Sequence, residues 1–266
     1  MHVIITENEK ILAERAVEYI IKFIHKKPDC VLGLATGKTP IAVYEGLISA
    51  HKRRKVSFKD VTTFNLDEYI GIPLDHKQSY SFYMDMNFFS HIDIQPENSN
   101  IPNSFAGDPY EVSEEYERKI EEKGGIDLQL LGIGSNGHIG FNEPTSSLSS
   151  RTRIKTLTPQ TIKDNSAFFG KGEFQPTQAI TMGIGTIMEA DTIILLASGA
   201  KKAQAVANMV EGPVSAFCPA TALQFHKKTV VIVDKEAGHQ LKNKEYYMHV
   251  DHLTGEGDNF YDFIGI

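Results

Sequence analysis

Basic residues, cysteines and long apolar runs are all scarce in this 266-residue chain, and each scarcity excludes a class of protein. Lys and Arg number 27 against 34 Asp and Glu, which gives a formal charge of −7 and a pI near 5.8. A nucleic-acid binder needs a basic face for the phosphate backbone, so we expect no nucleic-acid partner. No apolar run approaches the roughly 20 residues of a membrane-spanning helix, so we expect no membrane partner.

The two cysteines, Cys30 and Cys218, are too few for a disulfide framework, and we expect both to be reduced, buried thiols. Residues 1–7 show no basic segment followed by a long apolar stretch, so no signal peptide is expected. Hydrophobic residues make up 41% of the chain and charged residues 23%, which is typical of a packed domain. The composition therefore predicts a cytoplasmic, globular protein.

Helix-like and strand-like apolar patterns alternate along the chain. The 3.6-residue period of an amphipathic helix is expected at 9–27, 39–48, 79–89, 109–123 and 203–210. Short apolar strands are expected at 30–35, 61–66, 126–133, 153–157, 179–182, 192–197 and 229–233. Strands that alternate with helices form a mostly parallel sheet covered on both faces. We therefore predict a single Rossmann-like α/β domain of three layers over residues 1–266.

In such sheets, ligands bind beyond the carboxyl ends of the strands. Two glycine-rich segments lie at such strand ends and are therefore candidate ligand-binding loops. The first, GLATGKT at 33–39, has three residues between its first Gly and the Gly-Lys pair, where a P-loop needs four. A simple turn and a single-phosphate site at a helix N-terminus are equally good interpretations of it. The second, GIGSNG at 132–137, is followed by HIGFNEP, which is too rich in Gly and Pro for a dinucleotide-binding helix. Hydride transfer is therefore not expected.

Asp67 and His138 are the acid–base candidates. His138 shares a glycine-rich loop with Asn136 and Glu143, and a carboxylate bonded to an imidazole fixes its tautomer and stabilises the imidazolium. Asp67 follows a strand and precedes Glu68, where like charge and partial burial raise a carboxyl pKa, although helix capping is an alternative role. On neighbouring strand ends, the pair suits proton transfer at a carbon next to a carbonyl or imine. No ligand pair has the helical spacing typical of a metal site.

The chain resembles the glucosamine-6-phosphate deaminase family over essentially its whole length. The matching strings are GLATGKTP (33–40), FNLDEYIGI (64–72), GIGSNGHIGFNEP (132–144), SSLSSRTRIKTLT (146–158), and GAKKAQAV with a nearby VEG (199–212). The resemblance implies conversion of glucosamine 6-phosphate to fructose 6-phosphate and ammonia without a metal or cofactor. It also implies a homohexamer in many members, with N-acetylglucosamine 6-phosphate as an allosteric activator in some.

The resemblance also implies residue roles. Asp67 would remove the C2 proton, and His138 would serve ring opening, assisted by Asn136 and Glu143. The residues that would hold the substrate phosphate are Thr36, Gly37, Lys38, Thr39 and Lys202. The residues that match the activator's phosphate site are Ser146, Arg153 and Lys155.

Three positions depart from the family pattern. Several members carry Asp at the position of Asn136, some carry a phosphate-binding Arg at that of Ala167, and Lys38 stands where Gly is common. A neutral amide can orient an imidazole but adds no charge to stabilise its protonated form. We hypothesise that Lys38 supplies the cation that Ala167 lacks, with Lys163 or Lys171 as alternatives.

Two rival functions share this fold. A 6-phosphogluconolactonase hydrolyses a related sugar phosphate and needs no base for a C2 proton. A sugar-phosphate sensor usually carries a DNA-binding module, and we expect no room for one because the first helix is followed immediately by the sheet. The strings FNLDEY and GHIGFNEP favour the deaminase over the lactonase. Beyond Leu241 the chain diverges from the family, so either Tyr246 or Tyr247 could match an activator-site tyrosine.

Overall fold

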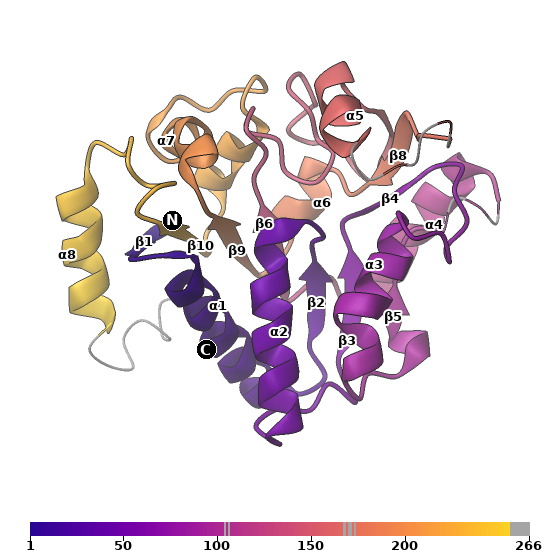
Figure 1. Cartoon of the computed structure of the whole chain (residues 1–266), viewed down its shortest axis with the longest axis horizontal. Coiled ribbons are helices and arrows are strands. Elements are labelled where there is room, and N and C mark those ends of the chain that lie inside the picture. Colours follow the sequence, from indigo (N-terminus) through magenta and orange to yellow (C-terminus); the bar gives the residue numbers. More distant parts are fainter. Residues whose placement is uncertain (104, 106, 167–168, 170–171, 173, 256–266) are drawn as a thin grey trace.

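A parallel sheet of seven strands forms the centre of the protein (Figure 1). The computed structural model describes residues 1–103, 105, 107–166, 169, 172 and 174–255. In their spatial order the strands are β1 (His2–Thr6), β10 (Thr229–Asp234), β9 (Thr192–Ala197), β6 (Leu128–Gly132), β2 (Val31–Leu34), β3 (Thr62–Asn65) and β5 (Ser99–Asn100). The predicted mostly parallel sheet is therefore confirmed.

Helices cover both faces of this sheet. The helices that pack on one face are α1 (Glu9–Lys26), α2 (Lys38–Lys52) and α3 (Tyr80–Asn87). Those on the other face are α4 (Pro109–Glu122), α6 (Ile184–Met188) and α7 (Ala203–Glu211). Within β9, Ile194 and Leu196 join the first apolar core, whereas Ile193 and Leu195 join the second. Because successive side chains of a strand point to opposite faces, a strand buried on both sides, such as β9, is apolar along almost its whole length.

A smaller antiparallel sheet lies beyond the end of β3. Its strands, in spatial order, are β4 (Asp67–Tyr69), β8 (Gln178–Thr181) and β7 (Arg153–Thr156), and α5 (Pro159–Ser166) follows β7. The predicted strands at 153–157 and 179–182 therefore form this second sheet and do not extend the main one.

The remaining elements are short or terminal. Helix α8 (Lys244–Gly255) lies beside β1 at one end of the sheet (Figure 1). The 3-10 helices are η1 (Phe89–His91), η2 (Pro96–Asn98), η3 (Ala200–Lys202) and η4 (Pro219–Phe225). No helix in the described part of the chain is long and apolar enough to cross a membrane.

The strand order reverses at β2. The chain first adds β3 and β5 on one side of β2, then returns to place β6, β9 and β10 on the other side. In open α/β sheets the crevice at such a reversal binds ligands, because the loops from the two strands diverge there. The turn after β2 and the loop at 133–144 after β6 meet at this point.

Candidate active site

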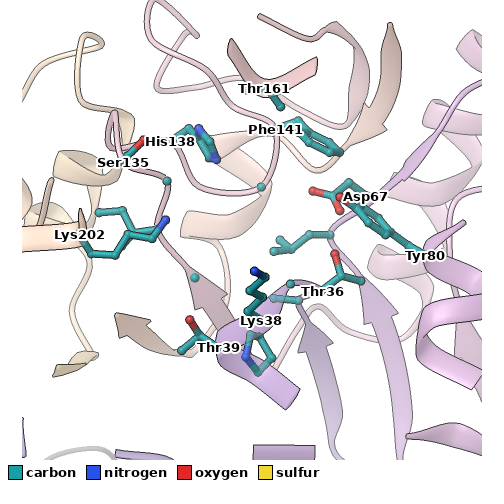
Figure 2. Close-up of a pocket in the computed structure, with 18 residues that line it drawn as sticks. Thr36, Lys38, Thr39, Asp67, Tyr80, Ser135, His138, Phe141, Thr161 and Lys202 are labelled. Carbon is teal, nitrogen blue, oxygen red and sulfur yellow. The ribbon is translucent and has the colours of Figure 1, made fainter. Parts of the chain in front are cut away.

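A cavity of about 310 Å³ opens at the strand-order reversal between β2 and β6 (Figure 2). Seven of the residues predicted for catalysis or substrate binding line it, namely Thr36, Gly37, Lys38, Thr39, Asp67, His138 and Lys202. Among the described residues, no three His, Cys, Asp or Glu side chains come together as metal ligands would. The cavity therefore brings the predicted acid–base groups and the predicted phosphate-binding groups together.

Asp67 and His138 do not follow neighbouring strands, so that prediction is wrong. They follow β3 and β6, and β2 lies between these two strands. The two side chains nevertheless share one cavity, because the loop after β6 passes close to β4 at Gly140. A Cβ atom at Gly140 would lie 3.4 Å from Asp67 Oδ2 and 3.0 Å from Thr181 Oγ1. Gly140 also has a φ of 54°, which favours glycine.

The Asp67 side chain points into the cavity from the first residue of β4 and is only 6% exposed (Figure 2). Burial, and then the charge of Glu68, raise the pKa of Asp67 to about 8. The Glu68 carboxylate accepts hydrogen bonds from the backbone N–H groups of Tyr69, Tyr80 and Ser81. Glu68 therefore binds the start of α3, which was the alternative role for Asp67.

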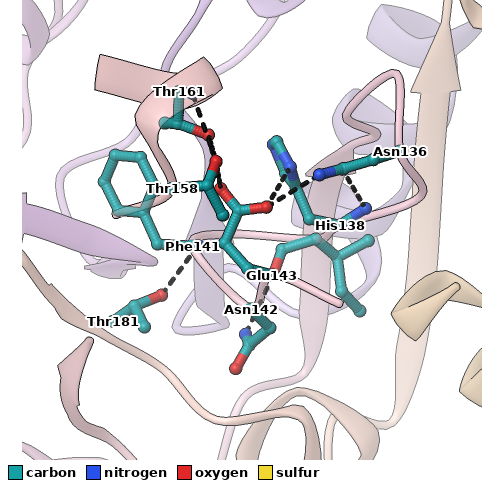
Figure 3. A network of polar contacts seen from close by, with 9 residues as sticks. Asn136, His138, Phe141, Asn142, Glu143, Thr158, Thr161 and Thr181 are labelled. Carbon is teal, nitrogen blue, oxygen red and sulfur yellow. Dashed lines mark hydrogen bonds and ion pairs between the residues drawn. The ribbon is translucent and has the colours of Figure 1, made fainter. Parts of the chain in front are cut away.

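The Glu143 carboxylate lies beside the His138 imidazole and connects the loop at 133–144 to helix α5 (Figure 3). His138 Nδ1 lies 3.4 Å from Glu143 Oε2, which is longer than a well-aligned hydrogen bond. Asn136 Nδ2 donates to the same carboxylate oxygen at 2.8 Å, and Asn136 Oδ1 accepts from the His138 backbone N–H at 3.2 Å. Asn136 therefore positions Glu143 and the His138 backbone and has no direct bond to the imidazole.

The Glu143 carboxylate stays ionised despite being only 2% exposed. Burial by itself would raise the pKa of Glu143, but the neighbouring His138 imidazole and the hydrogen bonds from Thr161 and Asn136 lower it to about 2. A fixed carboxylate beside an imidazole stabilises the imidazolium that forms when the ring takes up a proton. This arrangement suits a histidine that moves a proton within a bound substrate.

The opposite end of the cavity is suited to an anion. Gly37 precedes α2 with a φ of 109°, and no side chain caps this helix. The first N–H groups of α2 are therefore left for a ligand, and the helix dipole favours a negative charge there. The side chains of Lys38, at the start of α2, and Lys202, in η3, extend toward the same space from different elements (Figure 2).

The residues predicted for the activator lie outside this cavity. Ser146 is 2% exposed, and its hydroxyl has no hydrogen-bond partner within the part of the chain that the structure describes. Arg153 donates to Asn142 Oδ1 at 2.9 Å, and Lys155 lies two residues further along β7. Burial lowers the pKa of Arg153 and, together with the charge of Arg153, that of Lys155.

Two positions named in the sequence analysis, Ala167 and Lys171, lie outside the described residues. Of the two tyrosines named as candidates for the activator site, Tyr246 is exposed, whereas the Tyr247 hydroxyl donates to Glu211 at 3.0 Å.

Four further residues line the cavity although the sequence analysis did not predict them as site residues, namely Tyr80, Ser135, Phe141 and Thr161. Tyr80 stacks on Phe141 with ring centroids 6.0 Å apart, so these two form one aromatic wall. Tyr80 comes from α3, and no spacing in the sequence relates it to the other segments. A signal for Thr161 did exist: Thr158 followed by Pro159 is typical of a helix start.

Comparison with known proteins establishes the family. The family model described as glucosamine-6-phosphate isomerases/6-phosphogluconolactonase matches residues 6–232. A glucosamine-6-phosphate deaminase of Hahella chejuensis is 57% identical over 254 residues, which cover 96% of this chain and 97% of that protein. The chain belongs to the glucosamine-6-phosphate deaminase family. A second relative in this family, from Colwellia psychrerythraea, is 53% identical and covers 94% of each chain.

Solved structures agree with this assignment. A monomeric glucosamine-6-phosphate deaminase superposes with a TM-score of 0.87 at 44% identity, covering 90% of this chain and 99% of that one. A 6-phosphogluconolactonase from Trypanosoma cruzi has a TM-score of 0.73 at 19% identity, covering 91% and 97%, which shows a shared fold only. The resemblance seen in the sequence motifs is therefore confirmed, and the deaminases are the nearer group of these two.

Proposed function

We propose that this protein is a glucosamine-6-phosphate deaminase, which converts glucosamine 6-phosphate and water to fructose 6-phosphate and ammonia. The observation that carries this proposal is the cavity in which Asp67, with its raised pKa, faces His138 backed by Glu143. An aldose–ketose conversion needs both a group that opens the sugar ring and a base for the proton on C2.

Substrate binding begins at the N-terminus of α2. The phosphate accepts hydrogen bonds from the free N–H groups of the turn at 36–39, and Lys38 and Lys202 offset its charge. These local donors are needed because the protein as a whole carries a formal charge of −7. A phosphate held here places the sugar in the cavity between Asp67 and His138.

Ring opening is the step of His138. The imidazole takes the proton of the hydroxyl on C1 and returns a proton to the ring oxygen, while the bond between C1 and that oxygen breaks and the aldehyde forms. The imidazolium that exists during this transfer is stabilised by the ionised Glu143 carboxylate.

Isomerisation is the step of Asp67. The carboxylate removes the proton from C2 of the open-chain sugar and delivers it to C1, while the aldehyde oxygen gains the proton that the amino group gives up, which leaves a hydroxyl on C1 and an imine at C2. Water adds to this imine, and ammonia departs. A carboxylate whose pKa is raised to about 8 is a stronger base than an exposed one, because burial destabilises its charged form.

We extend the proposal to regulation and assembly. Ser146, Arg153 and Lys155 form the phosphate site of an allosteric activator, N-acetylglucosamine 6-phosphate, since they combine a buried, unpartnered hydroxyl with two half-buried cations. A homohexamer is the assembly implied by the sequence resemblance, although one solved relative is described as monomeric. The protein acts in the reducing cytoplasm, in keeping with its two free, buried cysteines.

One assay tests the activity. The purified protein is given glucosamine 6-phosphate, 6-phosphogluconolactone or unphosphorylated glucosamine, and ammonia and acid are measured. We expect ammonia from glucosamine 6-phosphate, little from glucosamine and no lactone hydrolysis above the uncatalysed rate. Lactone hydrolysis without ammonia release would assign the protein to the lactonase branch of the fold.

A further inference from the structure

The Glu143 carboxylate is bound by α5 as well as by its own loop. Its Oε2 atom faces Asn136 and His138. Its Oε1 atom accepts hydrogen bonds from the hydroxyl groups of Thr158, at 3.3 Å, and Thr161 (Figure 3). Building on the proposed deaminase activity, we propose that Thr161, supported by Thr158, is a positioning residue that holds Glu143 against His138 for ring opening.

The start of α5 gives these two hydroxyls a fixed geometry. The Thr158 hydroxyl accepts a hydrogen bond from the Thr161 backbone N–H at 3.2 Å, and the Thr158 carbonyl accepts one from the Ile162 N–H at 2.9 Å. Thr158 therefore caps the helix, with Pro159 at its first position. The hydroxyl oxygens of Thr158 and Thr161 are 3.0 Å apart, so both reach the same carboxylate oxygen.

The small antiparallel sheet anchors this cap. Thr158 comes two residues after β7 ends, and the Leu157 N–H donates to the Thr177 carbonyl at 2.9 Å, just before β8. Because β8 also pairs with β4, which carries Asp67, the cap of α5 is tied to the same framework as the catalytic carboxylate. The orientation of Glu143 is thus set from outside its own loop.

The position of Glu143 matters because its carboxylate is already at the outer limit of hydrogen-bond distance from the imidazole. At 3.4 Å from His138 Nδ1, the carboxylate loses most of a directional interaction if it rotates further away. Two donors on Oε1 and the Asn136 amide on Oε2 oppose that rotation. Thr161 is 9% exposed and lines the cavity, so its hydroxyl lies at the boundary between the substrate space and Glu143.

The consequence is selective for one step. Ring opening passes through the imidazolium of His138, which the oriented Glu143 carboxylate stabilises. Proton removal from C2 is performed by Asp67, to which neither Thr161 nor Glu143 donates or accepts a hydrogen bond among the described residues. Loss of the Thr161 hydroxyl should therefore slow turnover of the cyclic substrate and leave binding of an open-chain compound intact.

The experiment compares Thr161→Val, which removes the donor and keeps the shape, with Thr161→Ser, which keeps the donor. Thr158→Val serves as a second variant for the same carboxylate oxygen. The matched control is Thr186→Val, because the Thr186 hydroxyl also donates to a buried carboxylate, Glu117 Oε1 at 2.6 Å, outside the cavity. We expect Thr161→Val to lower kcat for glucosamine 6-phosphate by about 10-fold or more, since a hydrogen bond to a charged group is being lost. Thr161→Ser and Thr186→Val should stay within about twofold of the wild type.

Two further readouts separate positioning from packing. The Kd of 2-amino-2-deoxyglucitol 6-phosphate, which has no ring to open, should be unchanged in Thr161→Val. In a Glu143→Gln background, Thr161→Val should cause little further loss of kcat, because the two residues act as a unit.

Three outcomes would overturn the proposal: wild-type kcat in both Thr161→Val and Thr158→Val, a Thr161→Ser variant as slow as Thr161→Val, or a full additional loss in the Glu143→Gln background. Failure of the wild-type protein to release ammonia would instead refute the deaminase activity, and it is seen before any variant is made.

Discussion

At the scale of single residues, Asp67 combines a cost to the fold with a gain for the chemistry. Its carboxylate is 6% exposed and next to Glu68, and burial followed by the charge of Glu68 raises its pKa to about 8. The same shift makes it a stronger base and makes its charged form unfavourable in the folded protein. Activity and stability should therefore depend on pH in opposite directions through this one group.

The first prediction concerns activity. Replacing Asp67 by Asn should lower kcat by about 10²–10⁴-fold, the usual contribution of a positioned base. In the wild type, kcat/KM should rise with pH through the ionisation of Asp67 near pH 8, since the base acts only when deprotonated. The cationic amino group of bound substrate favours the carboxylate, so the corresponding limb of kcat should lie at lower pH. Pre-steady-state exchange of the C2 proton with deuterated solvent provides the measurement, and wild-type exchange in Asp67→Asn would contradict the assignment.

The second prediction concerns stability. Between the ordinary carboxyl pKa near 4 and about pH 8, Asp67 keeps its proton in the folded state and loses it in the unfolded state. The free energy of unfolding therefore falls as pH rises through this range, by up to about 1.4 kcal/mol per pH unit. Asp67→Asn should be more stable than the wild type by a margin that grows from pH 5 to pH 8. Urea unfolding at several pH values measures the margin, and a margin independent of pH would rule out this linkage.

At the scale of elements, the start of α2 is an anion site made from a turn that is one residue too short for a P-loop. Gly37 supplies the positive φ, α2 has no side-chain cap, and Lys38 places an ammonium group over the cavity. The third prediction is that Lys38→Gly and Lys38→Gln raise KM for glucosamine 6-phosphate by about 2–5-fold, the range of an exposed ion pair. The effect should shrink at 0.5 M salt, because salt screens exposed charges.

The matched control for Lys38 lies on the same helix. Lys52→Gln removes an exposed charge at the opposite end of α2, and it should leave KM unchanged. Adding an arginine by Ala167→Arg, at the position where some family members carry one, should partly restore KM in Lys38→Gln. Unchanged KM in both Lys38 variants would mean that Lys202 and the backbone N–H groups suffice for the phosphate.

The elements also show where sequence patterns were sufficient. The spacing of apolar residues predicted α1 and α4 and the strands β6, β9 and β10 to within a few residues. These elements pack against the apolar core, so the positions that face it must be apolar. Strand β1 was missed because HVIIT is a short apolar run without turn signals, and β4 because Asp-Glu-Tyr has no apolar pattern. The residues of β4 are buried because this strand pairs with β8 in the second sheet. That burial depends on a tertiary contact, which the sequence of β4 does not show.

At the scale of the whole molecule, the site is a convergence of segments far apart in the chain. Each motif identified its own residues, but the strand order decided which of them meet. The motifs gave no sign that β2 lies between the strands preceding Asp67 and His138, or that α5 binds Glu143 from the second sheet. Backbone pairing and packing determine those relations, and a single sequence contains no direct signal for them.

The last prediction concerns communication across this arrangement. Arg153 bonds to Asn142, which is adjacent to Glu143, so the proposed activator site on β7 touches the loop that carries the acid–base groups. N-acetylglucosamine 6-phosphate should therefore raise the rate at low substrate concentration in the wild type, and Lys155→Gln should lose this response because a phosphate-binding cation is gone. Light scattering on the same samples gives the assembly: a hexamer with a sigmoidal substrate curve fits concerted regulation, in which the activator shifts a two-state equilibrium. A monomer whose rate does not respond to the activator would contradict the activator site, and the bond from Arg153 to Asn142 would then only connect the small sheet to the loop.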